Sequence, residues 1–344
     1  MSNFFSWTGG RGPSAGKPPP KRLHLAMQGG GAHGAFTWGV LDRLLEDGRI
    51  AIGDLSGASA GAINAVMLAD GLLRGGRDEA RKRLADFWRA ASIGGKLPEL
   101  QRHVIERLFR AGPVMQHWLN TVSTMGGMFS PSNLNPLQIN PLKPIIERFA
   151  DFAALRADSS RRIFISATNV HTGDLRIFHR EEISAEAVMA SACLPLLFSA
   201  VEIDGVPYWD GGYVGNPPLL PFLDQDDADL LIVQIYPPLR ATTPHSPREI
   251  MNRASEISFN APLLAELRAI ETIRRRAAGG GKPPSLRLHR IALEDLDESL
   301  DSVGRLHNGY EYFDKLRQLG DAAARRFLVM HYDAIGLRGT LNER

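Results

Sequence analysis

One short run of small residues in this chain has the composition of a nucleophile elbow. Gly57-Ala58-Ser59-Ala60-Gly61 fits the pattern G-x-S-x-G, in which a sharp turn from strand to helix exposes a serine hydroxyl. Glycine suits both ends because a side chain at Gly57 or Gly61 would clash where strand and helix are pressed together. The apolar run Ala60 to Leu68 then predicts a buried helix whose positive N-terminus is aimed at Ser59. The alternative for this motif alone is an ordinary tight turn.

A glycine-rich loop precedes the elbow and lies between a strand and a helix. The apolar run Arg22 to Gln28 predicts a buried strand, and the helical spacing of apolar residues over Ala35 to Glu46 predicts a helix. Between them, Gly29, Gly31 and Gly34 satisfy G-x-G-x-x-G. With the strand that leads into the elbow, two successive βα units are expected, and they indicate an α/β fold.

The glycine-rich loop has two interpretations. Together with Asp54, which lies 20 residues beyond Gly34, it outlines a dinucleotide-binding fingerprint. In that fold, however, the ribose-binding acid ends the second strand, whereas here the second strand ends in Ser59. The other interpretation is an oxyanion hole, in which consecutive glycines let backbone N–H groups converge on a developing negative oxygen. An oxyanion loop beside an exposed serine makes one coherent site, so we favour it.

A third motif, Asp210-Gly211-Gly212, follows a strand predicted over Val206 to Trp209. A partly desolvated aspartate has a raised pKa, and Asp210 in such a pocket is therefore a base that can accept the serine proton directly. An Asp-Gly turn is the alternative. A histidine is the usual helper of a catalytic serine. The three candidate histidines are not in glycine-rich or strained loops and are interpreted as packing or surface residues: His289, His307 and His331.

Taken together, these motifs resemble the patatin-like phospholipase family. That family orders a glycine-rich oxyanion motif, a G-x-S-x-G elbow and a D-G-G/A motif, and the chain has all three in the same order. The run Ala190 to Pro195 resembles the A-S-x-x-x-P block of the family, and Asn216-Pro217 its segment after the aspartate. The resemblance covers about Arg22 to Pro238.

The resemblance implies a specific set of site residues. Ser59 and Asp210 would form a catalytic dyad without histidine, and no metal or cofactor is implied. The amides of Gly30, Gly31 and Ala32 would form the oxyanion hole. The remaining glycines of the three motifs are Gly29, Gly34, Gly57, Gly61, Gly211 and Gly212. One position departs from the family, because His33 stands where an arginine or lysine is usual, which weakens any expectation of a fixed cation there.

The resemblance also implies a three-layer α/β/α sandwich with a mostly parallel central sheet. We expect one catalytic domain over residues 21–344, with a core over about 22–238 and a C-terminal part over 239–344. A helical, lid-like insertion is expected over about 74–149, after the second βα unit. Residues 1–20 are rich in Gly, Pro and Ser and are expected to form a disordered tail.

Composition limits the partners and the compartment. The 344 residues include 40 basic and 38 acidic side chains, a net charge of +2, which argues against nucleic acid as a partner. The single cysteine, Cys193, fits a reducing compartment and is expected to be buried. The N-terminus lacks the apolar region of a signal peptide, and no run of 18 apolar residues predicts a transmembrane helix. A cytoplasmic location is expected, and peripheral contact with a membrane stays open.

The function that these observations favour is a serine lipid acyl hydrolase that cleaves carboxylic esters of lipids or phospholipids through an acyl-enzyme on Ser59. One alternative is a carboxylesterase or thioesterase acting on soluble acyl esters, for which the departure at His33 leaves room. An alternative from another class is a nucleotide-binding module that uses the loop Gly29 to Gly34. The sequence does not specify head group, chain length, positional preference, activating partner or oligomeric state.

Overall fold

The computed structural model describes nine stretches of the chain. They are residues 18–92, 140, 142–195, 197–225, 227–237, 239–240, 242–277, 285–294 and 309–341. Most of the predicted insertion and most of the predicted tail lie outside the described residues. The division into one domain, a tail and an insertion stays a prediction.

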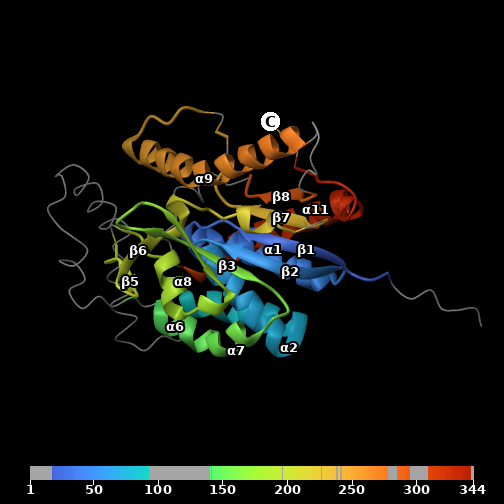
Figure 1. Cartoon of the computed structure of the whole chain (residues 1–344), viewed down its shortest axis with the longest axis horizontal. Helices are drawn as coiled ribbons and strands as arrows, with labels where there is room; N and C mark the ends of the chain where they lie inside the picture. The colour runs from blue at the N-terminus through green and yellow to red at the C-terminus, as the bar shows by residue number, and fades with distance from the viewer. Residues whose placement is uncertain are drawn as a thin grey trace, which may run out of the picture.

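A single mixed sheet organises the fold (Figure 1). Its strands pair in the order β5-β6-β3-β2-β1-β7-β8, and β4 also pairs with β3. The pairs β1/β2, β1/β7, β2/β3 and β7/β8 are parallel, whereas the hairpin strands pair antiparallel, so the predicted mostly parallel sheet is confirmed. The strands are β1 (Lys21–Met27), β2 (Ile50–Gly57), β3 (Ile163–Asn169), β4 (Leu175–His179), β5 (Val201–Ile203), β6 (Val206–Asp210), β7 (Asp229–Gln234) and β8 (Arg287–Ala292).

Helices cover both faces of the sheet, which confirms the three-layer α/β/α arrangement. The α-helices are α1 (Gly34–Asp47), α2 (Ala60–Ala91), α6 (Leu142–Phe149), α7 (Phe152–Ala157), α8 (Ala185–Ser191), α9 (Pro247–Ala277) and α11 (Tyr310–His331). The short 3-10 helices are η1 (Gly31–His33), η2 (Arg180–Glu182), η3 (Gly211–Tyr213), η4 (Leu220–Phe222) and η5 (Tyr332–Ala334). In Figure 1, α9 lies on one side of the sheet and α2, α6 and α7 lie on the other.

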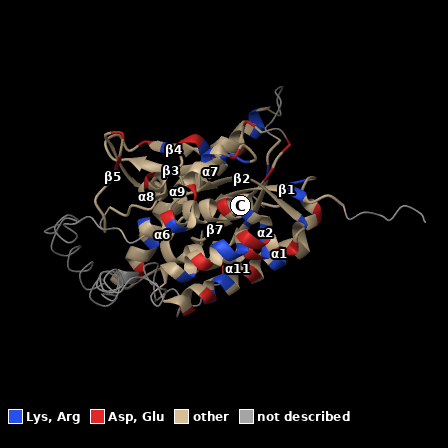
Figure 2. Cartoon of the chain, turned by 90° about the horizontal axis from the view of Figure 1, so that it is seen from below, with Lys and Arg blue, Asp and Glu red and all other residues tan. Residues whose placement is uncertain are grey.

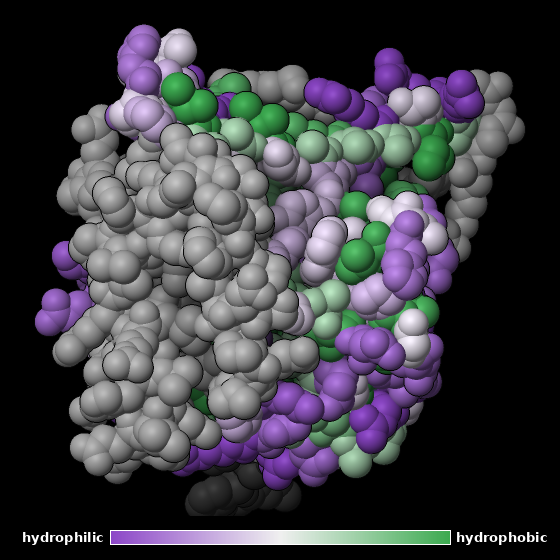
Figure 3. All heavy atoms as spheres, turned by 90° about the vertical axis from the view of Figure 1, so that its left-hand side faces the viewer, coloured by the Kyte–Doolittle hydropathy of each residue, from purple (hydrophilic) through white to green (hydrophobic). Residues whose placement is uncertain are grey.

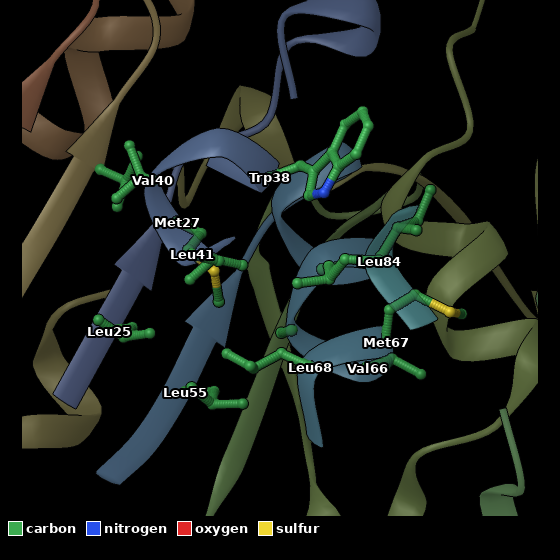
Figure 4. Close-up of a cluster of buried hydrophobic side chains, with 14 of the residues drawn as sticks. Leu25, Met27, Trp38, Val40, Leu41, Leu55, Val66, Met67, Leu68 and Leu84 are labelled. Carbon is green, nitrogen blue, oxygen red and sulfur yellow. The ribbon is translucent and has the colours of Figure 1, made fainter. Parts of the chain in front are cut away.

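The alternation of side chains along β1 shows how the sheet divides the core. Leu25 and Met27 face a core shared with α1, α2 and α11, whereas Ala26 faces a second core shared with α9. Successive side chains of a strand point to opposite faces, so a buried strand serves two cores. Figure 4 shows the first core, in which Leu55 of β2 and Leu68 of α2 lie beside the side chains of β1.

The helix that follows the elbow extends well beyond the apolar run Ala60 to Leu68 that predicts it. Helix α2 runs from Ala60 to Ala91. Gly75 and Gly76 have non-helical dihedrals, so α2 consists of two helical segments joined at a kink. The second segment contributes Leu84, Phe87 and Trp88 to the first core.

Candidate active site

The turn between β2 and α2 has the geometry of a nucleophile elbow. Ser59 lies between the last strand residue and the first helical residue, with φ 51° and ψ −122°, a conformation that costs energy for any residue with a side chain. A Cβ at Gly57 would lie 2.5 Å from the backbone of Gly61, and a Cβ at Gly61 would overlap the carbonyl oxygen of Met27. Both glycines are therefore required by close backbone approach, as the sequence predicts.

A second serine fixes the backbone of the elbow. The N–H of Ser59 donates a hydrogen bond to Oγ of Ser191, at 2.8 Å, and the Ser191 side chain is fully buried at the end of α8. Ser191 belongs to the A-S-x-x-x-P block that the sequence showed, but the pattern gave no indication of its partner. Ser191 is a positioning residue, since its hydroxyl holds the strained amide of the serine.

Asp210 is the last residue of β6, and its backbone is held on both sides. Its N–H donates to the carbonyl oxygen of Cys193 at 2.8 Å, and its carbonyl oxygen accepts from Oγ1 of Thr168 at 2.7 Å. Its Cα pairs with that of Ala167 on the neighbouring strand β3. Asp210 is thus placed by the sheet itself, with no exposed surface.

The strand register brings Ser59 and Asp210 to the same level of the sheet. Gly57 pairs with Ile165, so Ser59, two residues on, is level with Ala167, which pairs with Asp210. Adjacent strands are about 4.8 Å apart, so the two backbones are roughly 10 Å apart across β3. Two side chains can span such a gap, and the Ser59 side chain is close enough to the Asp210 carboxylate to lower its pKa.

The surroundings of Asp210 raise the pKa of its carboxylate. Burial raises its pKa from an ordinary 3.8 to about 7, because the charged form loses water, while a hydrogen bond from Gly212 and the Ser59 side chain lower it in part. The Gly212 N–H donates to Oδ1 at 2.7 Å, and Oδ2 has no hydrogen-bond partner among the described residues. One carboxylate oxygen is therefore left to accept a proton.

The glycine-rich loop lies directly against the serine. A Cβ at Gly29 would lie 2.7 Å from Cβ of Ser59, so only glycine fits there. The Gly29 N–H donates to Oδ1 of Asn216 at 2.6 Å, and Oε1 of Gln28 accepts from the backbone N–H groups of residues 235 and 236 at 2.8 and 2.9 Å. The predicted oxyanion residues, Gly30 to Ala32, then enter η1, where the first N–H groups of a helix lack intrahelical partners.

Sequence reasoning did not identify the partner of His33. This histidine is buried, and its Nε2 lies 2.9 Å from the hydroxyl of Tyr312 at the start of α11. Where the family usually has an arginine or lysine, this chain therefore has a histidine whose ring contacts the C-terminal helix α11. No pattern within the loop could reveal this contact, because its two residues are 279 positions apart.

Asp54, the acid that a dinucleotide-binding fingerprint would need, has a structural role. Its carboxylate accepts from the N–H of Arg162 at 2.8 Å, the Arg162 guanidinium at 3.0 Å and Gln225 at 2.9 Å. Burial would raise its pKa, but contacts with His24 and Arg162 outweigh burial and hold the pKa below its usual range. A carboxylate satisfied in this way has little capacity left for a ribose, which disfavours the dinucleotide interpretation.

The two described candidate histidines lie away from Ser59. His289 is on β8, and its ring nitrogens contact Asp229 and Thr340, each at 2.9 Å. Three strand spacings, or about 14 Å, separate β8 from β2. His331 ends α11 and packs against Phe327. Both are packing histidines as predicted, and His307 lies outside the described residues.

The described residues offer no alternative centre of metal or thiol chemistry. Among them, no group of three or more His, Cys, Asp or Glu side chains could hold a metal ion. Cys193 is buried as predicted, and burial raises the pKa of its thiol to about 12, so the reactive thiolate is scarce near neutral pH. None of the described helices is both long enough and apolar enough to cross a bilayer.

Comparison with known proteins places these motifs in a family. A search of curated proteins found no match. The solved structures that match include VipD from Legionella pneumophila, with 16% identity and a TM-score of 0.35 over 89% of this chain and 67% of that one. They also include the ExoU–SpcU complex from Pseudomonas aeruginosa, with 19% identity and a TM-score of 0.32 over 93% and 64%.

A further structure of the type III effector ExoU matches with 15% identity and a TM-score of 0.31, and the chain spans only 53% of its length. The model of the patatin-like phospholipase family matches residues 25–223, which is more than half of the chain and includes the glycine-rich loop, the elbow and Asp210. The chain therefore belongs to the patatin-like phospholipase family and is a hydrolase that acts on ester bonds.

Proposed function

We propose that the chain hydrolyses carboxylic esters of lipids through an acyl-enzyme on Ser59, with Asp210 as the base. The observation that carries the proposal is the pairing of a strained serine with a fully buried carboxylate, one oxygen of which has no hydrogen-bond partner among the described residues. Backbone strain and a displaced pKa are both typical of catalytic groups. Their presence at the ends of two strands that flank β3 favours a shared chemical step.

In the first step, Oγ of Ser59 attacks the ester carbonyl carbon while Oδ2 of Asp210 accepts the hydroxyl proton. The tetrahedral intermediate then collapses, the bond to the alcohol oxygen breaks, and the proton passes from Asp210 to the leaving alcohol. In the second step, Asp210 takes a proton from water as that water attacks the acyl-enzyme, and returns the proton to Ser59 as the fatty acid leaves. Each step leaves Asp210 in its starting state.

The raised pKa of Asp210 suits this role. A base is most effective when its pKa lies near the working pH, because it is then both ionised and basic enough to accept a proton. An ordinary carboxylate with a pKa of 3.8 would accept the serine proton far less readily than one with a pKa of about 7. Burial of Asp210 thus replaces the histidine of a triad.

The glycine-rich loop would stabilise the developing oxyanion. Gly29 is pressed against Ser59, so the amides of Gly30, Gly31 and Ala32 follow within the same short turn. Backbone N–H groups held by a rigid scaffold need not reorganise during the reaction, which is why such donors contribute strongly to catalysis. The anchoring of the loop through Gln28 and Asn216 supplies this rigidity.

Labelling with a fluorophosphonate probe tests the proposal, because such probes react with activated serines. We expect the wild-type chain to be labelled at Ser59, as mapped by mass spectrometry, and to hydrolyse both a short-chain ester and a phospholipid in micelles. Ser59→Ala is expected to abolish labelling and hydrolysis. The control is Ser160→Ala, because Ser160 is exposed and precedes β3. Hydrolysis of the soluble ester alone would instead support a carboxylesterase, and labelling elsewhere would refute the assignment of Ser59.

A further inference from the structure

Helix α9 buries two of its carboxylates against the protein. Glu256 is buried and pairs with Arg240 at 2.6 Å and with Arg253 at 3.1 Å. Glu266 is buried as well, and its carboxylate accepts hydrogen bonds from the backbone N–H groups of residues 219 and 220 at 2.6 and 2.9 Å. The inner face of this helix is therefore fixed by polar anchors in addition to apolar packing.

The same inner face touches the proposed active site. Phe259 packs against Gly212, next to the carboxylate of Asp210, and its carbonyl oxygen accepts from Nδ2 of Asn216 at 3.1 Å. Oδ1 of Asn260 accepts from Nε2 of Gln28 at 3.0 Å, at the start of the glycine-rich loop. Helix α9 thus supports both the loop and the aspartate motif.

The outer face of α9 is apolar. Ile250 and Ile257 expose 49% and 56% of their surface, and Leu264, seven residues further on, exposes 36%. A spacing of seven residues, close to two helical turns, keeps these side chains on one stripe. The other exposed apolar residues of the helix are Met251, Ala254, Ala261, Ala265, Ala269 and Ile273. Helix α9 therefore presents a stripe of aliphatic side chains to solvent, although its inner face also buries Phe259, Leu263 and Ile270.

The charges that α9 does expose are mainly positive. Arg268, Arg275 and Arg276 are exposed toward its C-terminal end, and Glu271, which is partly buried, pairs with Arg275. Glu249 is the one exposed acidic residue among the described residues of the helix, at its N-terminal end. Helices α1, α2 and α11 differ, because acidic and basic residues both occur along them (Figure 2). The combination on α9 complements a negatively charged apolar surface.

Two further exposed apolar side chains lie beside α9. Tyr213 directly follows the aspartate motif, packs against Phe259 and is 43% exposed. Leu220 is 45% exposed and adjoins α9 through the bond between its N–H and Glu266. Figure 3 shows hydrophobic atoms along its upper margin, the side of the molecule on which Figure 1 places α9.

We infer that the outer face of α9 is the surface by which this enzyme lies on an anionic lipid bilayer. The inference rests on the proposed function in one respect, which is that a lipid substrate would enter the site beside Tyr213 and the dyad. Amphipathic helices with cationic residues bind in the plane of the bilayer interface, with their apolar side chains among the lipid chains. Contact through Phe259 and Asn260 then places the docked helix directly behind the catalytic groups.

Vesicle flotation tests the inference without requiring turnover. We expect the full chain to float with vesicles of phosphatidylcholine and phosphatidylglycerol, to float less with phosphatidylcholine alone, and to dissociate as salt screens the charge. Ile257→Asp is expected to weaken binding about tenfold or more, since it places a charge where an aliphatic side chain would lie among the lipid chains. Arg268→Glu is expected to weaken binding roughly fivefold for each unit of charge removed.

Helix α11 supplies matched controls. Val329→Asp likewise replaces an exposed aliphatic side chain by a carboxylate, and Arg326→Glu repeats the charge reversal. Both lie on another helix and are expected to leave binding unchanged. All four variants are expected to hydrolyse a soluble short-chain ester like wild type. The inference is overturned if wild type does not float, if Ile257→Asp floats equally well, or if α9 instead forms a dimer that Ile257→Asp dissociates. Failure of the proposed function would appear differently, as a protein that floats but hydrolyses no ester.

Discussion

Replacement of Asp210 by asparagine should abolish hydrolysis and at the same time stabilise the fold in a pH-dependent manner. The pKa of Asp210 is about 7 in the folded chain, against an ordinary 3.8, because the carboxylate is buried. The folded state therefore binds its proton more tightly than the unfolded state. Ionisation of Asp210 consequently opposes folding, and stability is lost as the pH rises from about 4 to about 7.

The size of this change in the free energy of unfolding follows from the pKa shift of Asp210. A difference of about three pKa units at 1.36 kcal/mol each gives a cost of about 4 kcal/mol above pH 7, of which roughly 2 to 3 kcal/mol develops between pH 5 and pH 8. Asparagine cannot ionise and avoids this cost. It also keeps an oxygen for the Gly212 N–H, and its amide nitrogen replaces Oδ2, which has no hydrogen-bond partner among the described residues.

Urea unfolding at pH 5 and pH 8 measures this difference directly. The advantage of Asp210→Asn over wild type is expected to grow by roughly 2 to 3 kcal/mol between the two pH values. Asp204→Asn is the matched control, because Asp204 is exposed in the turn between β5 and β6. Its effect on the free energy of unfolding should be small and equal at both pH values. An Asp210→Asn advantage that does not change with pH would refute the claim that the buried carboxylate ionises near neutrality.

Three further predictions concern activity and the elbow. Hydrolysis of a soluble ester should fall as the pH drops below about 7, since protonated Asp210 cannot accept a proton, approaching about tenfold per pH unit; a rate that is constant down to pH 5 would contradict this. Ser191→Ala removes the acceptor of the Ser59 N–H and should lower kcat about tenfold in steady-state assays while fluorophosphonate labelling persists; an unchanged kcat would show that this bond does not position the serine. Gly61→Ala places a Cβ against a strand carbonyl oxygen and should lower stability by about 3 kcal/mol in thermal unfolding. Gly173→Ala, whose Cβ meets no atom within 4 Å, should cost only about 1 kcal/mol for its positive φ, and equal losses would argue against the clash.

The parts of the site that could be predicted from the sequence are those encoded by local backbone geometry. Gly57 and Gly61 are demanded by the approach of strand and helix, and Gly29 by its contact with Ser59, so a spacing pattern within a few residues carries the information. The βα units could be predicted for the same reason, because apolar periodicity is a local property of each element. Helix α2 extends past the apolar run that predicts it, Ala60 to Leu68, because its second segment also packs on the first core through residues such as Leu84.

The contacts that could not be predicted join residues far apart in the chain. The bond from Ser59 to Ser191 spans 132 positions, and the contact of His33 with Tyr312 spans 279. No periodicity links such pairs, and each depends on how α8 or α11 packs on the sheet. The burial of Glu256 on α9 could not be predicted either. A glutamate is usually a surface residue, and its partner Arg240 lies outside the helix.

Phospholipid hydrolysis by the dyad variants tests the central claim most directly. Release of fatty acid from phosphatidylglycerol in mixed micelles is measured at pH 8 for wild type, Ser59→Ala and Asp210→Asn, each shown to be folded by circular dichroism. Wild type is expected to release fatty acid, and each variant should be slower by about a thousandfold or more, because the two residues act in one step. An Asp210→Asn variant that retains most of the wild-type rate would contradict the Ser59–Asp210 mechanism.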